Sequence, residues 1–134
     1  MMKDKPGDER SLEDLRKFGA LIKGLRLKKG MSLREFARRI EVSPAYVSRI
    51  ERGRDNPPSV EILERMEDAL GVDRGTLLAE AGKLPSDFVD VFTESDANRE
   101  MMPLFMRTVQ GADLSTEDWA KLIQNIKKKK GKGE

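Results

Sequence analysis

A close succession of helix-start and helix-stop signals divides residues 11–82 into five short segments. Each segment opens on a side-chain oxygen that can accept a hydrogen bond from a free backbone N–H of the first helical turn. These residues are Ser11, Ser32, Ser43, Ser59 and Asp73. Glycine, which readily adopts the left-handed conformation that ends a helix, closes four of the segments at Gly30, Gly53, Gly71 and Gly82. The pattern predicts five helices that form one compact helical domain.

The second and third segments carry the most specific signals. Ser32 and Glu35 have the spacing of a capping box, in which the side chain of each accepts a hydrogen bond from a backbone N–H of the other. Ser43 precedes Pro44, which would take the first helical position, where the N–H that proline lacks has no helical partner. Residues 41–42 alone separate the two predicted helices, so the connection between them is very tight.

After the fifth segment the signals are further apart. Ser86 is predicted to cap a short helix, and residues 96–109 to form another, in which Pro103 either kinks the helix or begins a new one. A second capping box, formed by Ser115 and Asp118, precedes the last predicted helix.

The sequence shows no convincing strand and no internal repeat, so we expect an all-α chain. Residues 1–11 are polar and are predicted to be a disordered tail. Residues 12–82 are expected to form the five-helix domain, and residues 83–134 a C-terminal helical extension.

The composition excludes several classes of function. The 134 residues include no cysteine and no histidine, so the chain can form no disulfide and no thiolate metal site, and it lacks the commonest catalytic base. The sequence also has no Gly-rich phosphate loop, so we expect no enzyme activity, no cofactor and no metal. No apolar run approaches the roughly 18 residues of a membrane helix. We therefore expect a cytoplasmic protein that does not bind membranes.

The charge is strongly segregated along the chain, although the net charge is only +2. Residues 16–54 hold twelve Lys and Arg against three Glu, whereas residues 55–100 hold four Lys and Arg against twelve Asp and Glu. The basic block indicates a surface that faces a polyanion. The alternative is that these basic side chains only solvate the exteriors of the helices.

The third predicted helix combines an apolar side with an unusual outer side. Val47 and Ile50 can pack against the second helix, and Tyr46 lies on the flank. The remaining positions recur at helical spacing and carry Ala45, Ser48, Arg49 and Arg52. Methyl, hydroxyl and guanidinium groups are those that read base edges in the major groove of DNA. The helix N-termini at Ser32 and Ser43 offer backbone N–H groups and hydroxyls for phosphates.

These segments closely resemble the Cro/cI-type (XRE-like) helix-turn-helix family. The resemblance is carried by LREFARRIEVSPAYVSRIERG (33–53) and PPSVEILERMEDALGV (57–72), and extends over roughly residues 14–82. It implies a lambda-repressor-like DNA-binding domain that places its third helix in the major groove. The base-facing residues would be Pro44, Ala45, Ser48 and Arg49. The phosphate contacts would be Ser32, Ser43, Arg52 and Arg54.

The resemblance also implies one structural pair and shows one departure. Arg26 and Glu51 would form a partly buried ion pair with no catalytic role. Glu41 stands where the family often has a glycine in a left-handed turn. A residue other than glycine costs about 1 kcal/mol there, which the fold can tolerate.

Residues 83–134 offer more apolar surface than so few helices can enclose. We expect a dimerisation unit, because one recognition helix contacts only a few base pairs and a two-fold dimer doubles the contacts. The candidate interface residues are Phe105, Trp119, Leu122, Ile123 and Ile126. The alternative is that this region folds back and thickens the N-terminal core.

The sequence thus predicts a transcriptional regulator that binds double-stranded DNA sequence-specifically, most simply as a homodimeric repressor. An alternative is an antitoxin-like or mobile-element regulator whose C-terminal region binds a protein partner, such as a toxin or a peptidase, or is itself the target of a peptidase. Methionines at 101, 102 and 106 would then provide an adaptable surface.

Overall fold

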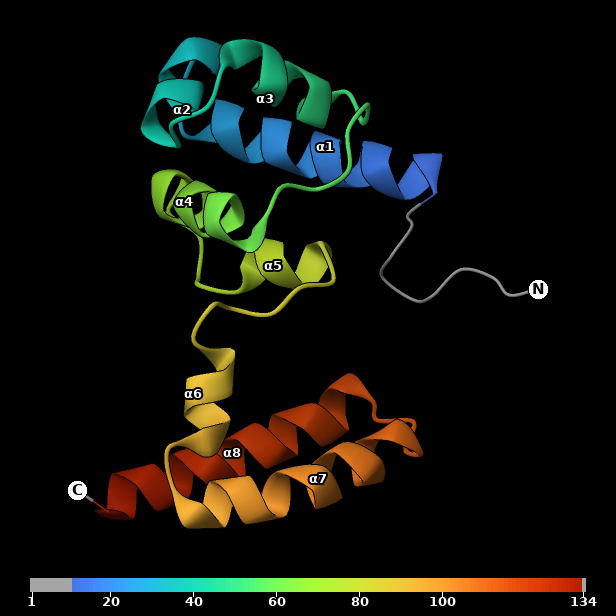
Figure 1. Ribbon diagram of the computed structural model, residues 1–134, viewed down its shortest axis with the longest axis vertical. Helices are drawn as coiled ribbons and strands as arrows, with labels where there is room; N and C mark the ends of the chain where they lie inside the picture. The colour runs from blue at the N-terminus through green and yellow to red at the C-terminus, as the bar shows by residue number, and fades with distance from the viewer. Residues whose placement is uncertain (1–10, 134) are drawn as a thin grey trace. The chain divides into compact units, whose positions relative to one another are not determined.

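The computed structural model describes the backbone of residues 11–133 and the side chains of residues 11–129. Within that range the chain is all-helical, as predicted, with eight helices and no strand (Figure 1). The helices are α1 (Leu12–Lys28), α2 (Leu33–Arg39), α3 (Pro44–Glu51), α4 (Val60–Leu70), α5 (Thr76–Glu80), α6 (Phe88–Thr93), α7 (Asp96–Gln110) and α8 (Thr116–Gly133). The predicted disordered tail lies outside the described residues except for its last residue, Ser11.

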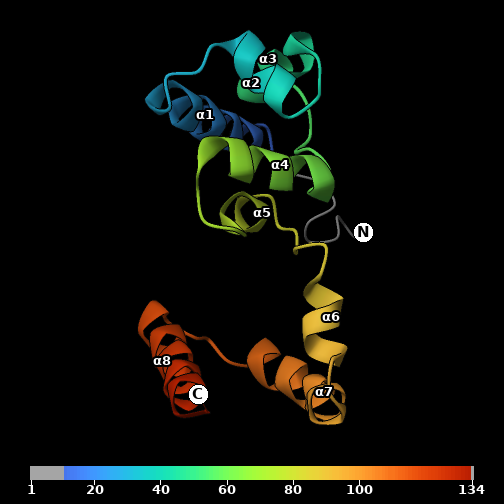
Figure 2. The same cartoon turned by 90° about the vertical axis from the view of Figure 1, so that its left-hand side faces the viewer.

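Within the described residues the chain divides into two compact units, residues 11–88 and residues 89–133. In the first unit, α3 packs against both α1 and α2, and α4 packs against α5 and also contacts α2 (Figures 1 and 2). The core consists of apolar side chains that the helical spacing turns inward. Its fully buried members include Ile22, Phe36, Ala37, Ile40, Val47, Leu63, Met66, Leu77 and Leu78.

Serine side chains begin the first four helices as the sequence predicts. The hydroxyls of Ser11, Ser32 and Ser43 accept hydrogen bonds from the backbone N–H three residues later, at 3.0, 3.0 and 3.1 Å, and that of Ser59 does so at 3.4 Å. Each bond satisfies one of the N–H groups that a helix leaves free in its first turn.

The predicted start of the fifth helix at Asp73 is wrong. Helix α5 begins after Gly75, whose φ of 96° is left-handed and which makes no side-chain cap. The cap comes instead from Glu67 on α4, which is only 2% exposed. Its carboxylate accepts hydrogen bonds from the N–H groups of Gly75, Leu77 and Leu78 at 3.0, 2.8 and 3.1 Å. A buried negative charge is thereby matched to the positive end of a helix.

The second unit contains α7 and α8 and nearly all of α6. Helix α7 runs without a break through Pro103, so this proline does not begin a new helix. The capping box before α8 is complete, since Ser115 N–H donates to the Asp118 carboxylate and Asp118 N–H donates to the Ser115 hydroxyl, both at 3.1 Å. Ser86 does not stand at the predicted capping position, because α6 begins at Phe88 and the residue before it is Asp87. The N–H and the hydroxyl of Ser86 both donate to the Glu64 carboxylate.

Glu41 offers a direct test of the tight turn between α2 and α3. It has a φ of 63°, the one left-handed conformation among the described non-glycine residues. Replacement by glycine removes the clash of Cβ with the backbone, but makes the unfolded chain more flexible. We expect Glu41→Gly to raise the free energy of unfolding by about 0.5–1 kcal/mol, measured by urea denaturation. Glu41→Ala is the control, because it removes the same carboxylate and keeps Cβ. An equal gain in both variants would show that charge, and not conformation, is responsible.

Candidate nucleic-acid interface

Helix α3 packs against neighbouring helices on one side and is exposed to solvent on the other. Val47 and Ile50 are buried against the neighbouring helices. Pro44, Ala45 and Arg49 are exposed, and Ser48 is half-buried. The four residues that the resemblance assigns to bases therefore lie on the side of α3 that does not enter the core.

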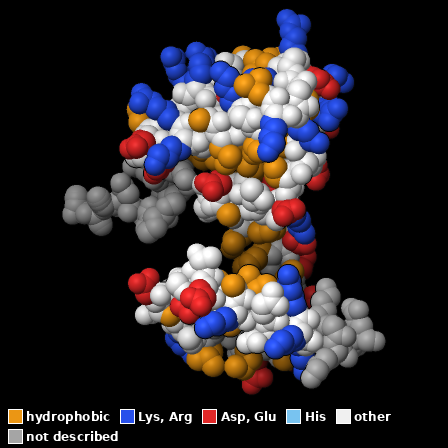
Figure 3. Space-filling model, turned by 180° about the vertical axis from the view of Figure 1, so that it is seen from behind, with side chains coloured by type: hydrophobic (Ala, Val, Ile, Leu, Met, Phe, Trp, Pro, Cys, Tyr) orange, Lys and Arg blue, Asp and Glu red, His pale blue; other side chains and the backbone are white. Residues whose placement is uncertain are grey.

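The residues assigned to phosphates lie around this helix. Ser32 and Ser43 are exposed at the N-termini of α2 and α3, and each hydroxyl oxygen already accepts a capping hydrogen bond. Each hydroxyl hydrogen can still be donated, which is what a phosphate oxygen requires. Arg52 and Arg54 are exposed just after α3, where Arg52 Nε donates to the Ser48 carbonyl at 3.3 Å. Figure 3 shows Lys and Arg side chains spread over this unit.

Arg49 has two neighbours that fix its guanidinium. Its Nε donates to the Asp55 carboxylate at 3.0 Å, and its Cζ lies 5.7 Å from the centre of the Tyr46 ring. Burial raises the pKa of Tyr46, and the Asp55 carboxylate raises it further, while Arg49 opposes the shift. The sequence does not indicate Asp55 as part of this site, because the residue lies in the loop after α3, outside any helical spacing.

Helices α1 and α3 approach so closely that two glycines are required. A Cβ on Gly19 would lie 2.4 Å from the Ile50 carbonyl oxygen, and one on Gly53 would lie 2.9 Å from the Cα of Arg16. Real atoms do not approach so closely, so larger residues would push the helices apart. Sequence periodicity does not single out Gly19, which resembles any small residue inside a helix.

Arg26 and Glu51 connect the same two helices through a buried ion pair. Arg26 Nε and Nη2 donate to the two carboxylate oxygens of Glu51 at 2.7 and 3.0 Å, and Arg26 Nη1 donates to the Met31 carbonyl at 2.9 Å. The two side chains are only 8% and 5% exposed. The hydrogen bond that Arg26 donates to Glu51 raises the pKa of Arg26, against the opposing effect of burial. The pair thus anchors the C-terminal end of α3 to α1 by two parallel charge-assisted hydrogen bonds.

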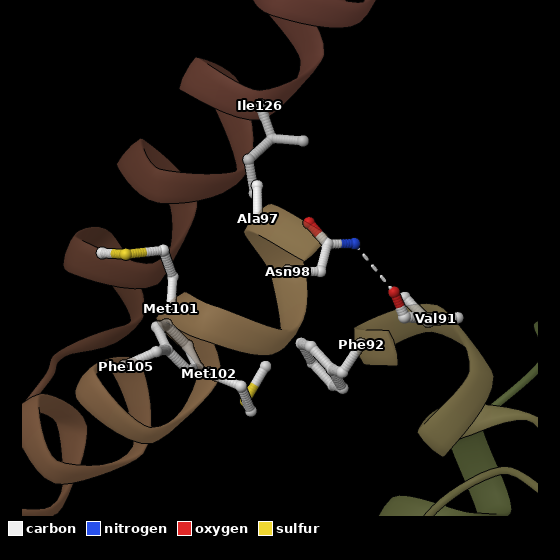
Figure 4. A pocket seen from close by; sticks show the side chains of 8 residues that line it. All are labelled: Val91, Phe92, Ala97, Asn98, Met101, Met102, Phe105 and Ile126. Carbon is white, nitrogen blue, oxygen red and sulfur yellow. Dashed lines mark hydrogen bonds between the residues drawn. The ribbon is translucent and has the colours of Figure 1, made fainter. Parts of the chain in front are cut away.

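The second unit carries the residues assigned to dimerisation, and all of them are at least 40% exposed. They are Phe105, Trp119, Leu122, Ile123 and Ile126. A groove of about 620 Å³ lies beside them (Figure 4). It is lined by Val91, Phe92, Ala97, Asn98, Met101, Met102, Phe105 and Ile126. Asn98 Nδ2 donates to the Val91 carbonyl at 3.0 Å and so connects α7 to α6 at this groove.

Residues 11–133 contain no group of three or more acidic side chains placed to hold a metal ion. In the same residues no helix has both the length and the apolar character to cross a membrane.

The arrangement of α2 and α3, two short helices joined by a tight turn, defines a helix-turn-helix protein. A helix-turn-helix family profile matches residues 22–77. The HTH-type transcriptional regulator DdrOP3 of Deinococcus deserti is 26% identical over 121 residues, 80% of this chain and 93% of the relative. The HTH-type transcriptional regulator SinR of Bacillus licheniformis is 35% identical over 86 residues, 60% of this chain and 78% of the relative. A crystal structure of SinR in complex with DNA is 41% identical and covers 46% of this chain and 97% of its own, with a TM-score of 0.43.

The chain belongs to the XRE-like helix-turn-helix family of transcriptional regulators. It is a DNA-binding regulator and not an enzyme, as the sequence predicts.

The ion pair between Arg26 and Glu51 can be tested by removing one charge or both. Glu51→Gln leaves a buried guanidinium without its counter-charge, and we expect it to lower the free energy of unfolding by about 3–5 kcal/mol. Arg26→Met with Glu51→Leu should recover most of that loss, because an apolar pair of similar volume is tolerated there. Urea denaturation measures each variant. Glu61→Gln, which breaks the exposed pair with Arg65, is the matched control and should change stability by less than about 1 kcal/mol. A double variant as unstable as Glu51→Gln would contradict this account.

Proposed function

We propose that this protein is a homodimeric repressor that reads its operator with α3. The observation that carries the proposal is the division of α3 into a buried apolar side and an open side with guanidinium, hydroxyl and methyl groups. Arg49 can donate two hydrogen bonds to guanine, Ser48 can bond to several bases, and Ala45 can contact a thymine methyl. Pro44 would contact the neighbouring base at the N-terminal end of the helix.

Phosphate contacts on both sides of α3 would fix its register on the duplex. Ser32 and Ser43 would donate their hydroxyls from two helix N-termini, where the helix dipole also favours an anion. Arg52 and Arg54 would contact phosphates beyond the other end of α3. Such contacts position the protein without reading sequence, and they make binding depend on salt.

Repression is the simplest regulatory outcome of this geometry. A protein that occupies a promoter excludes the polymerase by its volume alone, whereas activation requires a further surface that contacts the polymerase. The proposal therefore needs only sequence-specific binding, in the cytoplasm, to double-stranded DNA.

Dimerisation would supply the specificity that one recognition helix lacks. Two copies related by a two-fold axis would present their α3 helices to half-sites about 34 Å apart, or a multiple of that distance. The exposed apolar side chains of α7 and α8 favour the second unit as the interface.

A second candidate function is supported by the groove of the second unit. Its lining includes Met101 and Met102, whose flexible side chains adapt to different apolar partners. Under this alternative the groove binds a protein partner, such as a toxin or a peptidase, and that partner controls DNA binding.

Arg49→Ala tests the proposed reading of bases. A double-stranded operator is first selected from a random library by the full chain. We expect the variant to bind it about 5- to 150-fold more weakly, the fold-change equivalent to about 1–3 kcal/mol, and to lose preference at one base pair. Fluorescence anisotropy at two salt concentrations measures both effects. Arg52→Ala is the comparison, since loss of a phosphate contact weakens all sequences alike and reduces the salt dependence. Unchanged preference at every base pair in Arg49→Ala would refute the assignment.

Ile123→Glu tests the interface between copies. Sedimentation equilibrium should give a dimer for the parent chain and a monomer for this variant, because a carboxylate would be buried without a partner. The variant should also lose operator affinity. Gln124→Glu adds the same charge at the next position, beside polar residues of α8, and should leave the dimer intact. A monomeric parent chain that still binds its operator would favour the partner-binding alternative.

A further inference from the structure

We propose that Asp55 determines the base preference of this protein by positioning the guanidinium of Arg49. The inference rests on the proposed role of Arg49 in reading a base and adds the residue that makes this reading selective. Asp55 is thus a positioning residue, which acts through Arg49 and contacts no base itself.

The hydrogen bond between Asp55 and Arg49 leaves open the edge of the guanidinium that can bind a base. Asp55 accepts from Nε of Arg49 at 3.0 Å. Among the residues that the structure describes, neither terminal nitrogen of Arg49 donates a hydrogen bond. Guanine offers two acceptors, O6 and N7, to a pair of N–H groups on one edge of a guanidinium. Because Asp55 occupies Nε, the edge formed by the two terminal nitrogens is the one that remains to donate to guanine.

A second contact restricts the plane of the same group. The Tyr46 ring lies 5.7 Å below the guanidinium carbon, within the range of a cation–π interaction. The ring limits tilting of the guanidinium and the carboxylate limits its rotation, so the side chain loses less conformational freedom on binding than a free arginine would.

The loop that carries Asp55 is itself held at both ends. Arg54 N–H donates to the Arg49 carbonyl at 2.8 Å, which joins the start of the loop to the end of α3. Lys83 Nζ donates to the carbonyl of Pro58 at 2.8 Å, and Pro58 is buried. A pinned loop with two consecutive prolines keeps the carboxylate in place, which a positioning role requires.

The Asp55 carboxylate also has an electrostatic effect, which lowers the affinity for DNA. A negative charge beside α3 repels the phosphates of any duplex and weakens non-specific binding. Asp55 should therefore raise discrimination by orienting Arg49 on the correct base pair, while its charge lowers the affinity for every duplex alike. A carboxylate elsewhere on the surface would lower the affinity for every duplex but would change no base preference. At 46% and 32% side-chain exposure, the pair contributes little to stability, so it can be altered without unfolding the domain.

Asp55→Asn in the full chain tests the proposal on the selected operator. Affinities are measured for the operator, for its single-base-pair variants and for an unrelated duplex. We expect preference to fall about tenfold at the base pair that Arg49→Ala relaxes, and to stay the same at the other positions. Affinity for the unrelated duplex should rise, with a steeper salt dependence.

Two controls separate positioning from charge. Glu35→Gln removes a carboxylate that pairs with Arg39 on α2, so it makes the same charge change without touching Arg49. It should change the affinity for operator and unrelated duplex by the same factor. In an Arg49→Ala background, Asp55→Asn should cause no further loss of preference.

The outcomes distinguish this proposal from the one on which it rests. If Asp55→Asn keeps the full preference, or if it lowers preference equally in the Arg49→Ala background, Asp55 does not act through Arg49. If Arg49→Ala itself leaves every preference unchanged, Arg49 reads no base, and the assignments of both residues are overturned.

Discussion

The contact between α1 and α3 determines where the proposed recognition surface lies. Gly19 lets the two backbones touch, and the ion pair between Arg26 and Glu51 fixes the last turn of α3 against α1. A helix of only eight residues is too short to be stable by itself, so its direction is set by these packing contacts. The inner side of α3 is fixed by packing against α1, and its outer side is therefore held in a defined direction for binding.

Features of the fold that depend on residues three or four positions apart could be predicted from the sequence. Serine caps and apolar periodicity predict the first four helices because a cap and its N–H partner are three positions apart. The start of α5 could not be predicted in this way. Its cap, Glu67, comes from another helix, and nothing near α5 in the sequence reveals that contact. Asp73, which satisfies the local rule, makes no such cap.

The candidate site shows the same limit. The positions that α3 turns away from the core follow from helical spacing, and the structure leaves them open to solvent or half-buried. The contact between Arg26 and Glu51 is present, but the sequence indicates it only through the family resemblance. The contact between Asp55 and Arg49 depends on the path of the loop after α3, which no periodicity describes. Local rules thus indicate which positions of α3 form the proposed recognition surface, whereas tertiary contacts decide how each side chain is held.

The second unit links stability to the proposed assembly. None of its described side chains, from residue 89 to residue 129, is fully buried, and Trp119 and Ile126 are 42% and 66% exposed. A unit that buries so little apolar surface gains little free energy from folding alone. A second copy that covered this surface would stabilise each unit and the dimer together, since anything that binds only the folded form shifts folding toward it. A higher protein concentration would then increase two quantities together. These are the fraction of second units that are folded and the fraction of two-fold operators that are occupied.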